Sequence, residues 1–249
     1  QIRELLLDAG LTLIEREGVT SAVAGLTFKR VLAEVETRSG VVLHHASIIG
    51  RSYADQEAFQ RDLLARLVQR INEIELDDVV SAVRDVLAQA RLDSPEERLS
   101  ALIEIDRVGS LAHERTMRAV PLWSAWIAAV AAEGDRNRPD FSPETFEQLA
   151  ETVRAETRAF AALFRAIFDH LGFRARSPHT VEDLTVAISA LAEGVLVRGR
   201  VAPELFAPRP VAVDPRVEAR EWSILGLGIR ALSAAMAEPI PNWSPSSVN

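Results

Sequence analysis

An acid, a hydroxyl and an imidazole lie along one predicted helix, and these are the residue types of a serine hydrolase. They are Asp106, Ser110 and His113, in a helix predicted over 95–114. Their spacing places them in a line along one helix face, whereas a catalytic triad needs a base held between its nucleophile and an orienting acid. They could line a cavity, but the solvent-facing side of the helix is the favoured interpretation. The sequence therefore predicts that the protein is not an enzyme.

Metal and cofactor chemistry has little support in the sequence. The chain has no cysteine and five histidines. His44 and His45 are adjacent, so they would point to different sides of a helix, and no further ligand lies at a useful spacing. Neither a glycine-rich phosphate loop nor a nucleophile elbow is present. We expect no metal and no cofactor.

The elements that would position a functional surface are clearest at the N-terminus. A helix is predicted over 3–17 and ends at Gly18. Its apolar stripe recurs at helical spacing and consists of Ile2, Leu6, Ala9 and Leu13. The segment Leu26 to Val31 then opens a second helix, and Ser47 to Phe59 holds a short third helix and the start of a fourth. This order predicts a helix-turn-helix that reads DNA.

These residues resemble the N-terminal domain of TetR-family transcriptional regulators. The shared features are a first helix stopped by glycine, Leu26-Thr27 opening the second helix, and an aromatic, Tyr53, before Asp55-Gln56-Glu57-Ala58-Phe59. The resemblance covers residues 1–65, with weaker support from Ala190 to Arg198. One departure is the interval from Thr27 to Tyr53, which at 26 positions (53 − 27) is longer than in the family pattern.

The resemblance implies a set of DNA-contacting residues. Thr27 would cap the second helix, and the amides there, with Lys29 and Arg30, would bind phosphate. The third helix would enter the major groove, where Arg51 could donate two hydrogen bonds to a guanine. Ile48 and Ile49 would face inward. The full predicted set is Thr27, Lys29, Arg30, His44, His45, Ser47, Arg51, Ser52 and Tyr53.

Charge is distributed unevenly along the chain. The net charge is −8 over 249 residues, yet residues 1–70 hold nine basic and nine acidic side chains, so the deficit lies in the remainder. A neutral N-terminal part is compatible with DNA, although it is less basic than most DNA-binding modules. The absence of cysteine and of any apolar run of about 18 residues favours a cytoplasmic protein with no membrane segment.

The rest of the chain is expected to be helical, with no strand. Beyond the 95–114 helix, apolar periodicity and helix-start signals predict helices near 55–92, 117–134, 143–171, 180–199 and 215–237. We predict an all-α fold with three parts: a DNA-binding domain over 1–65, a helical dimerisation and effector domain over 66–238, and a disordered tail over 239–249.

Two late helices carry apolar stripes that suit a homodimer. Their small residues would allow four helices to pack about a two-fold axis. Burial of the same stripes within one chain is the alternative. The predicted interface consists of Leu184, Ile188, Leu191, Val195, Trp222, Leu225, Ile229 and Leu232.

An apolar effector pocket is predicted from aromatic residues further along the chain. Its lining would be Met117, Trp123, Trp126, Glu156, Phe160 and Phe164. Core packing explains the apolar members equally well. Glu156 lies on an apolar stripe, so it needs either an arginine of the same chain, which is favoured, or an effector.

These observations favour a DNA-binding transcriptional regulator. By the resemblance, it would be a homodimeric repressor that binds a double-stranded DNA operator and responds to an apolar small molecule. The alternative is a helical carrier or interaction protein that has lost DNA binding.

Overall fold

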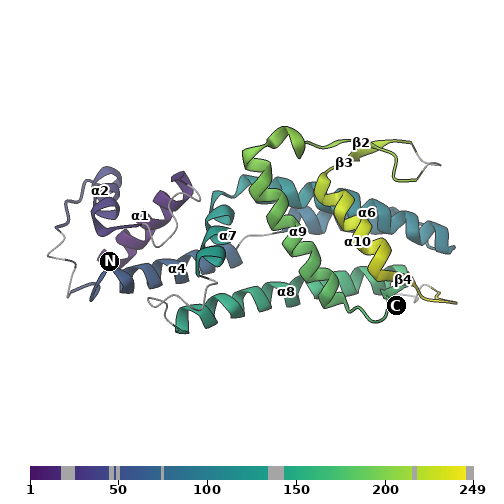
Figure 1. The fold of residues 1–249 in the computed structure, drawn as a ribbon, viewed down its shortest axis with the longest axis horizontal. Helices are drawn as coiled ribbons and strands as arrows, with labels where there is room; N and C mark the ends of the chain where they lie inside the picture. The colour runs from purple at the N-terminus through teal and green to yellow at the C-terminus, as the bar shows by residue number, and fades with distance from the viewer. Residues whose placement is uncertain are drawn as a thin grey trace. The chain divides into compact units, whose positions relative to one another are not determined.

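The computed structural model describes residues 1–17, 26–44, 48, 51–73, 76–133, 143–214 and 218–244 (Figure 1). The described chain is predominantly helical, which confirms the expected all-α class. It divides into two compact units: residues 1–75 with 119–153, and residues 76–118 with 154–249. Residues 121–133 therefore pack with the N-terminal segment, a grouping that the expected boundary at residue 65 did not include.

The first unit is built around its N-terminal helix. α1 packs against α2, α4 and α7. The bounds are α1 Ile2–Glu17, α2 Phe28–Ser39, α4 Gln56–Asn72 and α7 Pro121–Glu133. α2 ends at Gly40, whose φ of 68° lies in the left-handed region and whose N–H donates to the carbonyl of Glu36. α4 begins at Asp55, whose Oδ1 accepts from the amide of Ala58 at 2.7 Å.

The second unit is a helical bundle. Its helices are α5 Asp77–Gln89, α6 Pro95–Ala119, the C-terminal part of α8 Pro143–Leu171, α9 Val181–Val201, the 3-10 turn η3 Pro203–Leu205 and α10 Ile224–Met236. Local signals in the sequence fix two of the starts. Thr180 and Asp183 form a reciprocal capping box at α9, and the Ser223 hydroxyl accepts from the Gly226 amide at α10.

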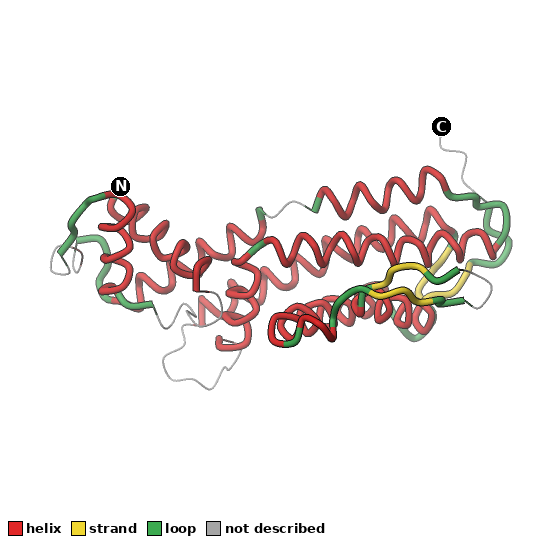
Figure 2. Tube along the Cα trace, turned by 90° about the horizontal axis from the view of Figure 1, so that it is seen from above, coloured by secondary structure: helices red, strands yellow, loops and turns green. Residues whose placement is uncertain are grey.

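Four short strands contradict the expectation of a chain without strands (Figure 2). β1 Phe173–Ala175 pairs antiparallel with β4 Ala237–Pro239, and β2 Arg209–Val211 pairs antiparallel with β3 Arg220–Trp222. Each has three residues, which is too short for an alternating pattern to be read from sequence. The β1–β4 pair joins segments that are far apart along the chain, whereas β2 and β3 are close in sequence.

Two further expectations are corrected by the structure. The helix predicted over 55–92 is two helices, α4 and α5, separated at residues 73–76. The predicted disordered tail begins with ordered contacts: Pro239 ends a paired strand, the Ile240 amide donates to the Gly172 carbonyl at 2.8 Å, and the Trp243 ring lies 4.9 Å from the Arg98 guanidinium. Within the described residues, no helix is both long enough and apolar enough to span a bilayer.

Candidate nucleic-acid interface and helical bundle

Three aromatic rings in mutual contact hold the candidate DNA-binding surface together. Phe28 at the start of α2, Tyr53 in the turn before α4, and Phe59 on α4 have ring centroids separated by 5.2 to 6.2 Å. All three side chains are buried, as are Leu26 and Ile48. Such ring pairs contribute beyond their buried area. The start of α2 and the segment ahead of α4 are therefore fixed to one core.

Tyr53 is wrongly placed in the predicted DNA-contacting set. Tyr53 is only 4% exposed, and its hydroxyl oxygen is inaccessible to solvent. The Arg3 guanidinium lies over its outer ring face, 4.7 Å from the centroid. The physical reason is that the aromatic closing the turn is needed as a core residue between Phe28 and Phe59. Burial also raises the pKa of the Tyr53 hydroxyl.

Only the end of the predicted third helix belongs to the described residues. Ile48 is fully buried, as expected for an inward-facing residue, and its carbonyl accepts from the amides of Arg51, Ser52 and Tyr53 at 3.3, 2.9 and 3.2 Å. These hydrogen bonds tie Arg51, Ser52 and Tyr53 to the buried Ile48. His44 is exposed, whereas His45, Ser47 and Ile49 lie outside the described residues.

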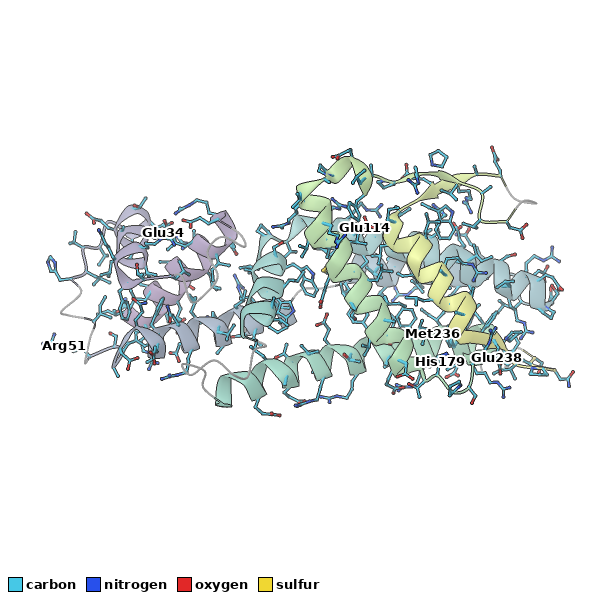
Figure 3. The ribbon with its side chains drawn as sticks, viewed as in Figure 1. Glu34, Arg51, Glu114, His179, Met236 and Glu238 are labelled. Atoms are coloured by element: carbon cyan, nitrogen blue, oxygen red, sulfur yellow. The ribbon has the colours of Figure 1, made fainter. Side chains whose placement is uncertain are left out.

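Lys29 and Arg51 are exposed cations next to this core. Neither forms an ion pair with any residue that the structure describes, and Figure 3 shows Arg51 projecting from the margin of its unit. Arg30 differs because it forms an ion pair with Glu17. Thr27 occupies the N-cap position of α2, as predicted, but its side chain makes no capping hydrogen bond. The hydroxyl of the exposed Thr27 therefore makes no hydrogen bond to the first turn of α2.

The predicted effector residues fall in two different units. Trp123 and Trp126 lie in the first unit, where both are buried. Met117, Glu156, Phe160 and Phe164 lie in the second unit. Met117 is buried and Phe164 packs against the bundle core. The structure does not establish one pocket from these six residues.

Glu156 meets another carboxylate where an arginine was expected. Within the described residues it makes no ion pair or hydrogen bond. Burial, reinforced by the nearby Glu193 of α9, raises the pKa of Glu156 to about 7. Burial likewise raises the pKa of Glu193. Sequence reasoning missed Glu193, which lies 37 positions further along the chain and meets Glu156 only through the fold.

A third helix, α6, contributes an imidazole that contacts α8. His113 on α6 contacts Phe160 edge-on, with ring centroids 5.9 Å apart. Phe160 is one turn along α8 from Glu156. Burial lowers the pKa of His113 to about 4, so that the imidazole is neutral at pH 7. His113 and Phe160 therefore join α6 to α8 through a contact between two rings.

The favoured interpretation of Asp106 and Ser110 as solvent-facing is wrong. Both are buried, because α10 covers this side of α6. The Ser233 hydroxyl donates to Asp106 Oδ1 at 3.2 Å, and Arg230 Nη1 is 4.0 Å from Oδ2. Burial raises the pKa of Asp106 to about 7 despite Arg230 and Ser233, which lower it. Asp106 therefore serves as a polar link between α6 and α10.

Most of the predicted dimer residues are buried within the chain itself. Leu184, Ile188, Val195, Leu225 and Ile229 belong to the bundle core. Trp222 is also buried and lies on β3, outside the helix in which it was predicted. These six side chains are therefore not available as a surface for a second copy. Leu191 and Leu232 are partly buried against the same core.

A different face of α9 carries exposed valines, with the partly exposed Glu193 among them. Val186 is 55% exposed and Val201 is 86% exposed, with Val197 between them on the same face. Gly194 also lies on this face, with open space where a Cβ would stand. On α10, the exposed residues include Ala231, Ala234 and Ala235. The apolar stripes predicted from the sequence as the dimer interface lie on the opposite, inward-facing sides of both helices.

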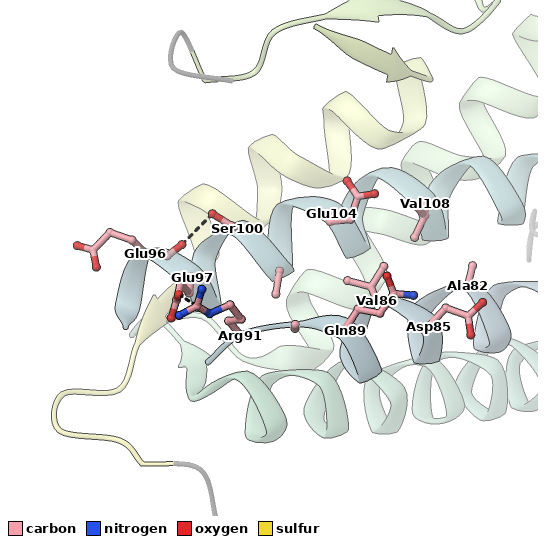
Figure 4. A pocket seen from close by; sticks show the side chains of 12 residues that line it. Ala82, Asp85, Val86, Gln89, Arg91, Glu96, Glu97, Ser100, Glu104 and Val108 are labelled. Atoms are coloured by element: carbon pink, nitrogen blue, oxygen red, sulfur yellow. Dashed lines mark hydrogen bonds and ion pairs between the residues drawn. The ribbon is translucent and has the colours of Figure 1, made fainter. Parts of the chain in front are cut away.

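A groove between α5 and α6 was not anticipated from the sequence (Figure 4). It has a volume of about 690 Å³, and its floor includes Val86 and Ala101. Its acidic residues are already engaged in part: Glu97 pairs with Arg91 at 3.2 Å, and Glu104 pairs with Arg107 at 2.6 Å. The groove is therefore open and apolar at its base, with ion pairs at its margin.

Comparison with known proteins places this arrangement among transcriptional regulators at the level of the fold. A TetR-family transcriptional regulator from Cytophaga hutchinsonii superposes with a TM-score of 0.55, and a candidate transcriptional regulator from Rhodococcus sp. RHA1 with 0.53. Each comparison covers 94% of both chains at 12% identity. No family model matches the sequence, and no curated protein matches it. The chain has the fold seen in TetR-family regulators, which confirms the resemblance found at its N-terminus.

Proposed function

We propose that the protein is a DNA-binding transcriptional regulator whose first unit contacts double-stranded DNA. The observation that carries the proposal is the aromatic core that holds Lys29 and Arg51 close to the start of α2. Cations without acidic partners can neutralise phosphate, and an arginine can also donate to a guanine edge. The regulator fold, shared over nearly the whole chain, supports the same assignment.

We further propose that DNA is bound by a homodimer. The exposed face of α9 formed by Val186, Gly194, Val197 and Val201, together with the alanines of α10, supports this choice. A second copy of the same face would cover apolar area and place small residues where two helices must approach closely. In this arrangement the protein would act as a repressor that an effector in the second unit releases from its operator.

The DNA assignment is tested by fluorescence anisotropy with labelled DNA from upstream of the protein's own gene, at several salt concentrations. Arg51→Ala should weaken binding at least tenfold. Lys29→Ala should reduce the slope of log affinity against log salt concentration by about one, the value for one lost phosphate contact. Arg70→Ala is the matched control, because Arg70 already pairs with Glu73 on the exposed side of α4. Retained affinity in the Arg51 and Lys29 variants would refute this interface.

The dimer is tested separately by sedimentation. Val197→Glu should convert the dimer to monomer, whereas Leu99→Glu, an exposed leucine on α6, should leave it unchanged. A Val197→Glu protein that remains dimeric would exclude the α9 face as the interface.

A further inference from the structure

The groove between α5 and α6 is long and open to solvent (Figure 4). On α6 its lining extends from Glu96 to Val108, which corresponds to about 18 Å of helix at 1.5 Å per residue. A small molecule in such a groove would stay largely in water, whereas small-molecule pockets bury roughly 70 to 90% of their ligand. An elongated partner therefore suits this volume of about 690 Å³ better.

The apolar part of the lining consists of small side chains from both helices. Ala82, Val86 and Ala90 lie on α5, and Ala101 and Val108 lie on α6. Because these side chains are short, a third helix can approach α5 and α6 to the usual interaxial distance of about 8 to 10 Å. Larger side chains of the third helix would then occupy the volume of the groove. An amphipathic helix binds to a groove in this way, through its apolar face.

The charged groups of the lining are mostly acidic. Among the described residues, four carboxylates and one guanidinium line the groove: Asp85, Glu96, Glu97, Glu104 and Arg91. Glu97 pairs with Arg91, and Glu104 pairs with two arginines outside the groove. Asp85 and Glu96 are exposed and form no ion pair with any residue that the structure describes. One carboxylate on each helix thus remains for a positively charged partner.

We propose that this groove binds an amphipathic helix of another protein, with alanine and leucine on its apolar face and lysine or arginine on both sides. The apolar face packs on the alanines and valines of the groove, and the basic side chains lie beside Asp85 and Glu96. The acidic margin disfavours a helix with acidic flanks, since like charges repel. This inference goes beyond the proposed function, because it assigns a protein partner to the second unit and does not depend on DNA binding.

The test titrates the whole chain, without DNA, into a fluorescein-labelled model peptide of sequence KLAKLAKKLAKLAK and follows fluorescence anisotropy. As a helix, this peptide has one apolar face between lysines and is about as long as the groove. It should bind saturably and at least tenfold more tightly than the same peptide with glutamate in place of each lysine. The affinity should fall as salt is added, because Asp85 and Glu96 are exposed to solvent.

Two pairs of substitutions locate the binding site. Ala82→Trp fills the groove from α5 and should weaken peptide binding at least tenfold. Ala88→Trp is its matched control, because Ala88 is an exposed alanine of the same helix that does not line the groove. Asp85→Lys reverses a charge at the margin and should weaken binding severalfold and reduce its salt dependence. Asp169→Lys makes the same change on the exposed surface of α8 and should leave binding unchanged.

Three results from the peptides and groove variants would overturn the proposal: no saturable binding up to millimolar peptide, equal binding of the glutamate peptide, or unchanged affinity in the Ala82→Trp and Asp85→Lys proteins. A loss of affinity in the two controls equal to that in the groove variants would also overturn it, because general charge attraction would then explain the binding. The four substituted positions are exposed or half-buried, so the variants should fold, which circular dichroism verifies.

Discussion

Asp106 provides a test of how the bundle holds α6 and α10 together. Its side chain is 2% exposed and is linked to Ser233 and Arg230 of α10. Its pKa is about 7 in the folded state, whereas the ordinary pKa of an aspartate carboxyl, taken for the unfolded chain, is 3.8. A raised folded pKa means that the protonated form is favoured by folding. The contribution of Asp106 to stability is therefore fully present below pH 3.8 and is lost as the pH rises through about 7.

The size of the effect follows from this difference of about three pH units. At 1.36 kcal/mol a unit, ionisation of Asp106 lowers the free energy of unfolding by about 4 kcal/mol at alkaline pH. Asp106→Asn keeps the shape of the side chain and cannot ionise. Relative to wild type, we expect the variant to gain roughly 2 to 3 kcal/mol between pH 5 and pH 8.

Urea unfolding followed by circular dichroism measures this difference at the two pH values, and hydrogen exchange in peptides from α6 and α10 localises it. Other titrating groups are common to both proteins, so they cancel in the comparison. A stability difference that is the same at pH 5 and pH 8 would refute the assignment of a buried, ionising Asp106. Asp169→Asn, on an exposed surface of α8, should show no such pH dependence.

Other substitutions test the packing directly, by the free energy of unfolding in urea. Gly10→Ala should destabilise the first unit by about 1 to 3 kcal/mol, because its Cβ would lie 2.8 Å from a methyl of the buried Leu63. Gly109→Ala should stabilise α6 by up to about 1 kcal/mol, because the atom nearest to the new Cβ would be 3.6 Å away. A change of the opposite sign in the free energy of unfolding of either glycine variant would contradict the packing. Ser223→Ala should cost about 1 to 2 kcal/mol through loss of a buried cap, and unchanged exchange at the start of α10 would argue against that role. Gly172→Ala should cost more than about 2 kcal/mol, because φ is +67° and Arg98 and Trp243 occupy the Cβ position; a melting temperature equal to wild type would exclude that close packing.

Helix positions were predicted well wherever local chemistry marks an end. The expected helix over 143–171 coincides with α8, and the start predicted at residue 95 coincides with that of α6. The break between α4 and α5 was missed because residues 73–76 contain neither glycine nor proline. Only Asp77 and Asp78, acids suited to a first helical turn, marked it. Local signals thus identify helix starts more reliably than periodicity identifies interruptions.

The predicted interface failed for a different physical reason. Periodicity shows that a stripe is apolar, but an apolar stripe is equally satisfied by its own chain and by a second copy. In α9 the large residues, such as Leu184, satisfy the intrachain core, which leaves valines and Gly194 outside. The sequence did indicate the exposed face of α9, because valines and small residues there lie opposite the stripe of leucines. Tyr53 shows the same limit, since its type suits both a base contact and an aromatic core.

Glu156 and Glu193 show why part of a site can be predicted from sequence while its chemistry cannot. Glu156 stood out because it interrupts an apolar stripe, and an arginine was the reasonable partner for an isolated acid. The fold places a second acid, Glu193, near Glu156 instead, so the charge of Glu156 is reinforced and not balanced. An arginine partner would have made Glu156 a structural residue with its charge already balanced. A second carboxylate instead adds to the effect of burial and raises the pKa of Glu156 to about 7, so that a proton can offset part of the negative charge.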